Sequence, residues 1–190
     1  MTVAVTALND DPTVAAALSD TVSEDADGFN IDLLASATDQ EGDDLSISNL
    51  ILADGDDSGI TIDRTNLNVD PNAYNALAVG ESEVITYSYD VVDINGGSVA
   101  QTASITITGE NDGPVVSAAV EATQTEDDDT FTVDLLVGAS DPDTSDILSI
   151  ANLNRTSGDD NGITIDGTNL NIDPNAYNTL AVGENEIITY

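Results

Sequence analysis

The chain has 190 residues, of which 37 are Asp or Glu and only two are Lys or Arg, so its formal net charge is −35. That balance excludes nucleic acid as a partner, because phosphate binding requires clustered Lys and Arg. The chain has no Cys and no His, which excludes disulfides, thiol nucleophiles and imidazole ligands, while its 40% hydrophobic content separates it from disordered acidic tails. No segment approaches the ~20 apolar residues of a membrane span, so we expect no membrane insertion.

One block of sequence occurs twice. Residues 60–87 and residues 163–190 differ at only five positions, and the match extends upstream at an offset of 102 that becomes 103 near Ile147. A period of that length has about the size of an immunoglobulin-like sandwich. We therefore expect the last strand and linker of a preceding repeat in residues 1–10, a complete β-sandwich repeat in residues 11–112, and in residues 113–190 a second repeat that is truncated before its last strand.

Alternation of apolar and polar residues predicts short strands throughout the chain. The two longest are joined by a turn over residues 93–97 that is rich in residues tolerating positive φ. In chain order, the expected strands are residues 2–6, 12–22, 29–33, 45–50, 59–62, 66–69, 84–92 and 98–108. About seven short strands per hundred residues predict an all-β fold of tandem immunoglobulin-like β-sandwich repeats.

A single helical turn is expected where this pattern is interrupted. Asp70 is an N-cap residue and is followed by Pro71, a residue favoured at the first helical position. Tyr74 and Leu77 are three apart and would share the inner face of the turn. Packing alone explains these residue types, so we interpret the segment as a plug at one end of the sandwich rather than as a binding site.

Acidic residues alternate in a predicted loop of each repeat. Asp39, Glu41 and Asp43 occupy the first loop, and Asp141 and Asp143 occupy the second. Hard cations such as Ca2+ take six to eight oxygen ligands, several of which one such loop can supply. The spacing is like the start of an EF-hand loop, but strands flank it and the twelfth position is a leucine. A solvated acidic turn is the alternative.

Further acidic and amide side chains fall where predicted strands end or linkers begin. They are Glu24, Asp93, Asn111, Asp112 and Glu126. If the sandwich gathers them at its ends, carboxylates without basic neighbours repel one another unless a cation lies among them. Adaptation to salt, with monovalent ions screening the charge, is a second explanation for the acidity.

Several of these motifs, in this order, carry a family resemblance. They are the Ser-Glu-Asp at residues 23–25, the acidic loop at 39–43, the block at 70–81, the strand and turn at 87–97, and the strand and linker at 105–114. The chain resembles the cadherin-like tandem repeats, including VCBS repeats, of bacterial RTX adhesins. The resemblance implies a secreted, extracellular repeat at the bacterial cell surface. It also implies that Ca2+ bound between neighbouring repeats stiffens the string as a spacer in cell adhesion and biofilm formation.

The resemblance also implies sets of metal ligands. The set around the first linker is Asn9, Asp10, Asp39, Glu41 and Asp93, and Asp43 of the same acidic loop is a further candidate ligand. The set around the second linker is Glu24, Asn111, Asp112, Asp141 and Asp143, and Glu126 is expected to serve a third. The sequence departs from similar cadherin linkers at two positions. Gly109 stands where those linkers carry an acidic residue. Gly113 precedes Pro114, and the linker is one residue shorter there than in cadherins.

Alternatives remain for the function and for the reason why the repeats at the two ends of the sequence are incomplete. A carbohydrate-binding sandwich is one, although the chain has no Trp and few aromatic residues. An enzyme ranks last, because the acids recur once per repeat in turns rather than in a cleft. A leading strand without its domain and a domain without its closing strands fit either a segment of a longer repeat array or head-to-tail association of copies by β-strand exchange.

Overall fold

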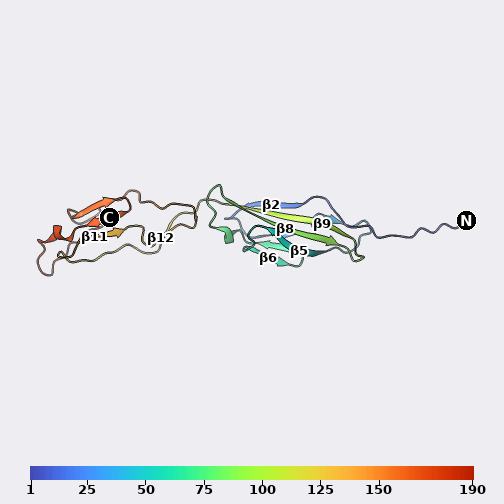
Figure 1. The fold of residues 1–190 in the computed structure, drawn as a ribbon, viewed down its shortest axis with the longest axis horizontal. Helices are drawn as coiled ribbons and strands as arrows, with labels where there is room; N and C mark the ends of the chain where they lie inside the picture. Colours follow the sequence, from blue (N-terminus) through green and yellow to red (C-terminus); the bar gives the residue numbers. More distant parts are fainter. The chain divides into compact units, whose positions relative to one another are not determined.

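The computed structural model describes residues 1–190 and divides into two compact units. The first unit contains Met1–Asp112 and Asp143–Ser145, and the second contains Gly113–Pro142 and Asp146–Tyr190. Strands and two short 3-10 helices are the only regular elements (Figure 1), and no helix has the length and hydrophobicity of a membrane span. The prediction of an all-β fold is confirmed.

The first unit has nine strands and one 3-10 helix. They are β1 (Thr13–Val14), β2 (Leu18–Ser23), β3 (Phe29–Asp32), β4 (Ala37–Thr38), β5 (Ser46–Asp54), β6 (Ile60–Asp63), β7 (Asn66–Val69), η1 (Pro71–Tyr74), β8 (Ser82–Val92) and β9 (Ser98–Thr108). The strands form a four-stranded sheet in the order β2-β9-β8-β5, a three-stranded sheet in the order β3-β7-β6, and the pair β1-β4.

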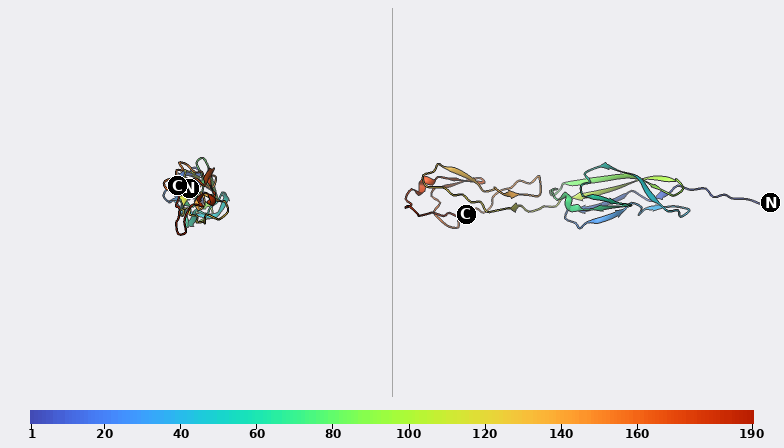
Figure 2. Two further views of the ribbon diagram at one scale, coloured as in Figure 1. Left: turned by 90° about the vertical axis from the view of Figure 1, so that its left-hand side faces the viewer. Right: turned by 90° about the horizontal axis from the view of Figure 1, so that it is seen from below.

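The long strands β8 and β9 form the centre of the four-stranded sheet. They pair antiparallel without a break from Ser82↔Thr108 to Val92↔Ser98, and Figure 2 shows them side by side. On its other edge β9 pairs with β2 in parallel. A central strand of this kind has neighbours on both sides, so its backbone groups are satisfied within the sheet.

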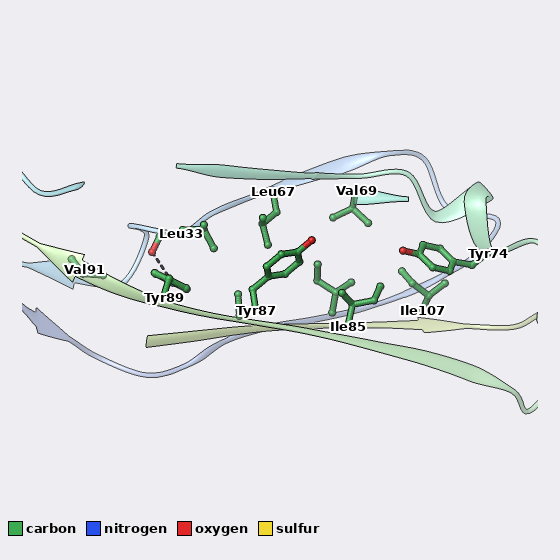
Figure 3. Close-up of a cluster of buried hydrophobic side chains, with 11 residues drawn as sticks. Leu33, Leu67, Val69, Tyr74, Ile85, Tyr87, Tyr89, Val91 and Ile107 are labelled. Atoms are coloured by element: carbon green, nitrogen blue, oxygen red, sulfur yellow. Dashed lines mark hydrogen bonds between the residues drawn. The ribbon is translucent and has the colours of Figure 1, made fainter. Parts of the chain in front are cut away.

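The core lies between the two sheets of the first unit. Every second side chain is buried from Ile85 to Val91 of β8 and from Gln101 to Ile107 of β9, as the alternating sequence predicts. Leu67 and Val69 of β7 pack against Ile85 and Tyr87 of β8 (Figure 3). Because strands of period two present one apolar face each, the two sheets can bury these faces against each other.

Two tyrosines of the core place their hydroxyl groups on backbone carbonyls. Tyr89 donates to the carbonyl of Leu33 at 2.8 Å (Figure 3), and its burial raises its pKa to about 12. Tyr74, on η1, donates to the carbonyl of Asp56 at 2.8 Å and accepts from the amide of Gly59 at 3.2 Å. Tyr74 belongs to the buried core cluster and Leu77 packs against it, so the expected packing role of the helical turn is confirmed.

The second unit forms only part of the same arrangement. Its elements are β10 (Val115–Val116), β11 (Phe131–Asp134), β12 (Ala139–Ser140), β13 (Ile163–Asp166), β14 (Asn169–Ile172) and η2 (Pro174–Tyr177). They form a three-stranded sheet, β11-β14-β13, and the pair β10-β12. A counterpart of the four-stranded sheet is absent from this unit.

Two expectations about strands need correction. Residues 2–6 form no strand and are exposed, because no segment of this structure pairs with them as β2 and β8 pair with β9. The extended stretch predicted over residues 12–22 is two strands, not one. Its first part pairs antiparallel with β4 and its second part pairs parallel with β9, so the chain crosses from one sheet to the other between Val14 and Leu18.

Candidate metal centres

Asp93 is the centre of a first cluster of oxygen ligands. It directly follows β8 and is 7% exposed. Its Oδ1 accepts hydrogen bonds from the backbone amides of Asn95, Gly96 and Gly97 at 2.8, 2.7 and 2.9 Å. Its Oδ2 accepts from the side-chain amide of Asn9 at 2.9 Å. The turn thus holds the carboxylate in place and directs its second oxygen toward the first linker.

These hydrogen bonds keep Asp93 ionised. The bond from Asn9 is the largest influence on its pKa, and together with the three backbone amides it holds that pKa below the ordinary value of 3.8. Gly97 allows the close approach, since a Cβ at this position would collide with Oδ2 of Asp93 and with Oδ1 of Asp11. Asp11, which the predicted ligand set omits, therefore also lies at this cluster.

The acidic loop at residues 39–43 folds around one of its own carboxylates. Oδ1 of Asp39 accepts from the amides of Glu41 and Asp43 at 2.9 and 3.0 Å. Oε2 of Glu41 accepts from the amide of Asp10 at 3.2 Å, and Oδ2 of Asp43 accepts from the side chain of Asn95 at 2.5 Å. Oδ2 of Asp39 is buried and has no hydrogen-bond partner. The loop is therefore tied to the first linker and to the turn after β8.

Glu24 is the centre of a second cluster at the other end of the first unit. Its side chain is 1% exposed, and its backbone amide donates to the carbonyl of Thr108, the last residue of β9, at 3.0 Å. Oε1 accepts from the amide of Glu110 at 2.8 Å, whereas Oε2 is buried without a hydrogen-bond partner. A buried carboxylate oxygen in this state is costly unless a cation or a proton compensates it.

The linker that follows Glu110 brings two more carboxylates together. The amide of Asp112 donates to Oδ2 of Asp143 at 3.0 Å, and Oδ2 of Asp112 accepts from the side chain of Asn75 at 2.5 Å. The side chain of Asn111 donates to the carbonyl of Asp112 at 2.7 Å. Asp143 is 1% exposed although it lies in an acidic loop, and the carboxylate oxygens of Asp141, Asp143 and Asp146 lie within 4.8 Å of one another.

The structure thus connects most of the predicted ligands in pairs. In the first set, Asn9 contacts Asp93, Asp10 contacts Glu41, and the acidic loop joins Asp39 to Asp43. In the second set, Asp112 contacts Asp143, while Glu24 binds the backbone one residue before Asn111. Glu126, the counterpart of Glu24, is half-buried and forms no hydrogen bond with another predicted ligand.

Sequence analysis missed five residues of these clusters: Asp11, Asn75, Asn95, Glu110 and Asp146. Asn95 carries a local signal, since it stands two positions after Asp93 in the same turn. Asn75 carries none, because it comes from the duplicated block and reaches Asp112 only through the fold. The atoms of both clusters that could bind a metal are carboxylate, side-chain amide and carbonyl oxygens. Oxygen ligands of this kind suit Ca2+ rather than a soft transition metal.

The sequence model of a known family matches this chain over more than half of its length. That family is described as "cadherin-like domain", and the match covers residues 8–108. The chain belongs to the cadherin-like domain family. Its matched region lies within the first unit and contains strands β1 to β9. Cadherin-like domains are extracellular modules of structural and adhesive proteins that occur in tandem and typically bind Ca2+.

Similar solved structures include two cadherin ectodomains. The human desmocollin-1 ectodomain is 17% identical, with a TM-score of 0.41 over 88% of this chain and 31% of that one. Domains 3–6 of protocadherin gamma B2 are 14% identical, with a TM-score of 0.39 over 85% and 38%. A nucleoside hydrolase-related protein from Saccharophagus degradans is 18% identical, with a TM-score of 0.35 over 53% and 26%. The cadherin-like chain spans less than half of each, and no curated protein matches it.

Proposed function

We propose that this chain is a calcium-binding spacer of a bacterial adhesin or surface filament, in which Ca2+ stiffens a string of cadherin-like repeats during cell adhesion and biofilm formation. Glu24 carries the proposal, because one of its carboxylate oxygens is buried without a partner beside a linker rich in further oxygen ligands. The ligands are Asn9, Asp10, Asp39, Glu41, Asp43 and Asp93 at the first linker, and Glu24, Asn111, Asp112, Asp141 and Asp143 at the second.

The charge of the chain supports a bound cation. Arg155 forms the only ion pair, with Asp160 at 3.3 Å, and both side chains are about 40% exposed, so the pair contributes little to stability. Protein cations therefore cannot compensate the buried carboxylates. A divalent ion that binds the folded state alone would stabilise it by mass action, by about 2.7 kcal/mol at a concentration one hundred times its dissociation constant.

The carbohydrate-binding alternative finds no support in the positions of the aromatic residues. Tyr74, Tyr87 and Tyr89 are buried, and the other aromatic side chains are half-buried. A sugar-binding platform needs an exposed aromatic ring, and none of these side chains is exposed. The spacer is therefore the better-supported function.

A matched pair of variants tests the calcium proposal. Glu24→Gln removes the buried charge at the second linker, while Glu126→Gln makes the same change at the equivalent position of the second repeat. We expect Ca2+ to raise the melting temperature of the unmodified chain and of Glu126→Gln, and to raise that of Glu24→Gln much less. Equal calcium responses in all three proteins would contradict the assignment of Glu24.

A further inference from the structure

Two asparagines of the chain, Asn95 and Asn161, directly precede a glycine. Asparagine is chemically labile, and it deamidates most readily before glycine, because glycine has no Cβ to hinder its own backbone nitrogen. That nitrogen forms a bond to Cγ of the asparagine, the bond from Cγ to Nδ2 breaks, and ammonia leaves with the displaced proton. Water then opens the resulting succinimide ring to aspartate or isoaspartate.

The first of these glycines lies in an open turn. Gly96 belongs to the turn over residues 93–97 that joins β8 to β9, and its φ is +101°. A Cβ built on Gly96 would meet no atom within 4 Å, and Asn95 is exposed. The surroundings therefore leave room for the succinimide ring to form between these two residues.

The second glycine is enclosed. The amide of Gly162 donates to the hydroxyl of Tyr177 at 3.3 Å, and a Cβ on Gly162 would lie 2.5 Å from the carbonyl oxygen of Asp173. Gly59 is enclosed in the same way in the first repeat, so this packing belongs to the repeated fold. Ring closure at Asn161 would have to displace packed backbone, and the fold therefore protects that residue.

The side chain of Asn95 joins its turn to the acidic loop at residues 39–43. Its Nδ2, the atom that deamidation removes, donates to Oδ2 of Asp43 at 2.5 Å. The product carries a carboxylate in place of this amide. Because the ion pair of the chain lies elsewhere, between Arg155 and Asp160, no basic side chain is paired with Asp43 to offset the added charge. The new carboxylate and that of Asp43 therefore repel each other.

We propose that Asn95 is a site of spontaneous deamidation in the folded chain, and that the reaction converts the hydrogen bond between the turn and the acidic loop into a repelling pair of carboxylates. The amide of Gly96 donates to Oδ1 of Asp93 at 2.7 Å. Ring closure requires this bond to open, so the reaction is slower in the folded chain than in the denatured one. The proposal requires no bound cation, so it and calcium binding at Glu24 can fail separately.

Incubation at mildly alkaline pH in EDTA, followed by peptide mapping, measures deamidation at each asparagine. In the folded chain we expect Asn95 to react several times faster than Asn161. In urea we expect similar rates, because the fold no longer distinguishes the two sites. Equal rates in the folded chain, or no reaction at Asn95 over a period in which it reacts fully in urea, would overturn the proposal.

Three variants test the consequence of the reaction. Asn95→Asp supplies the aspartate product directly, Asn95→Ser removes the amide without adding charge, and Asn161→Asp adds the same charge in the second repeat. In EDTA at neutral pH, we expect Asn95→Asp to lower the melting temperature of the first unit more than Asn95→Ser does, and Asn161→Asp to leave it unchanged. A loss with Asn95→Asp no larger than with Asn95→Ser would contradict the repelling pair.

Discussion

The two repeats share one nearly duplicated block, but its two copies differ in structure. In both, a β-hairpin is followed by a 3-10 turn, and the tyrosine of that turn donates to an aspartate carbonyl at 2.8 Å. After the turn the copies diverge. Residues 82–87 belong to strand β8, where all six pair with β9 and the last two also pair with β5, whereas their equivalents at 185–190 form no strand.

The difference separates local from non-local determinants of the fold. The hairpin closes over the two residues between Asp63 and Asn66, so its pairing requires only nearby sequence. Strand β8 needs β9 and β5 as neighbours, and the second repeat lacks a β9. The same segment therefore becomes a strand in one repeat and stays irregular in the other.

The hydrophobic core also differs between the two units. Leu67, Ile85 and Tyr87 are at most 2% exposed in the first unit. In the second unit only Leu170, at 7% exposure, and Pro174 are buried. The apolar face of one sheet is buried only when a second sheet packs against it, and the second unit lacks the four-stranded sheet. Most of the stabilisation from apolar burial therefore comes from the first unit.

Supplying the missing strands should produce the largest change. If residues 88–108 are appended after Tyr190, we expect residues 120–125, 149–157 and 185–190 to become strands, because each then has the neighbour that its equivalent has in the first unit. Amide hydrogen exchange would show strong new protection in these three segments. An appended sequence with the order of residues 98–108 scrambled is the control, and similar protection with that control would refute the explanation.

Truncating equivalent leucines should show the next largest difference. Leu67→Ala is expected to lower the free energy of unfolding of the first unit by about 3 kcal/mol, because it leaves a cavity between two sheets. Leu170→Ala should lower that of the second unit by only about 2 kcal/mol, because no four-stranded sheet packs over this site. Urea unfolding followed by resonances of each unit measures both, and equal losses would show that the second core is as complete as the first.

A smaller effect is expected from pH, and it should be confined to the first unit. Because the folded pKa of Asp93 lies below its ordinary value of 3.8, its ionised form stabilises the fold. This stabilisation is complete above roughly pH 5 and is lost as pH falls through 3.8 toward the folded pKa. Acid also relieves the repulsion of a net charge of −35, which acts in the opposite direction.

The contribution of Asp93 is therefore measured as a difference between variants. Asp93→Asn should reduce the stability of the first unit at pH 6 and have little effect at pH 2. Asp44→Asn removes the same charge from an exposed position and should show no such pH dependence. The urea midpoints of the unmodified chain and of the two variants, measured between pH 2 and pH 6, test this expectation. If the midpoints of the two variants changed with pH in the same way, the expectation would be contradicted.

The sequence predicted the elements whose partners lie close in the chain and missed those that depend on distant ones. The hairpin, the turn at Pro71 and the long strands β8 and β9 are where the pattern placed them. Residues 2–6 have the alternation of a strand but no neighbour to pair with. Apolar periodicity shows which face of a strand is buried, but it does not show whether another strand is present to bury it.

The candidate sites show the same limit. Alternating acids and predicted strand ends indicate Asp39, Glu41 and Asp93 from the sequence alone, because loops that follow strands meet at the ends of a sandwich. The amide side chains of Asn75 and Asn95 are evident only from their contacts with Asp112 and Asp43. Residue types do not show which backbone amides will donate hydrogen bonds, although such amides hold Asp93 and Glu24 in position.

Thermal unfolding combined with small-angle scattering tests the central claim most directly. The chain would be measured with EDTA, with millimolar calcium, and with sodium chloride at far higher ionic strength. If its carboxylates form specific sites, calcium alone raises the melting temperature of the first unit and reduces the flexibility of the chain. If sodium chloride has the same effect as calcium, the acids form a screened, salt-adapted surface, and the calcium-stiffened spacer is contradicted.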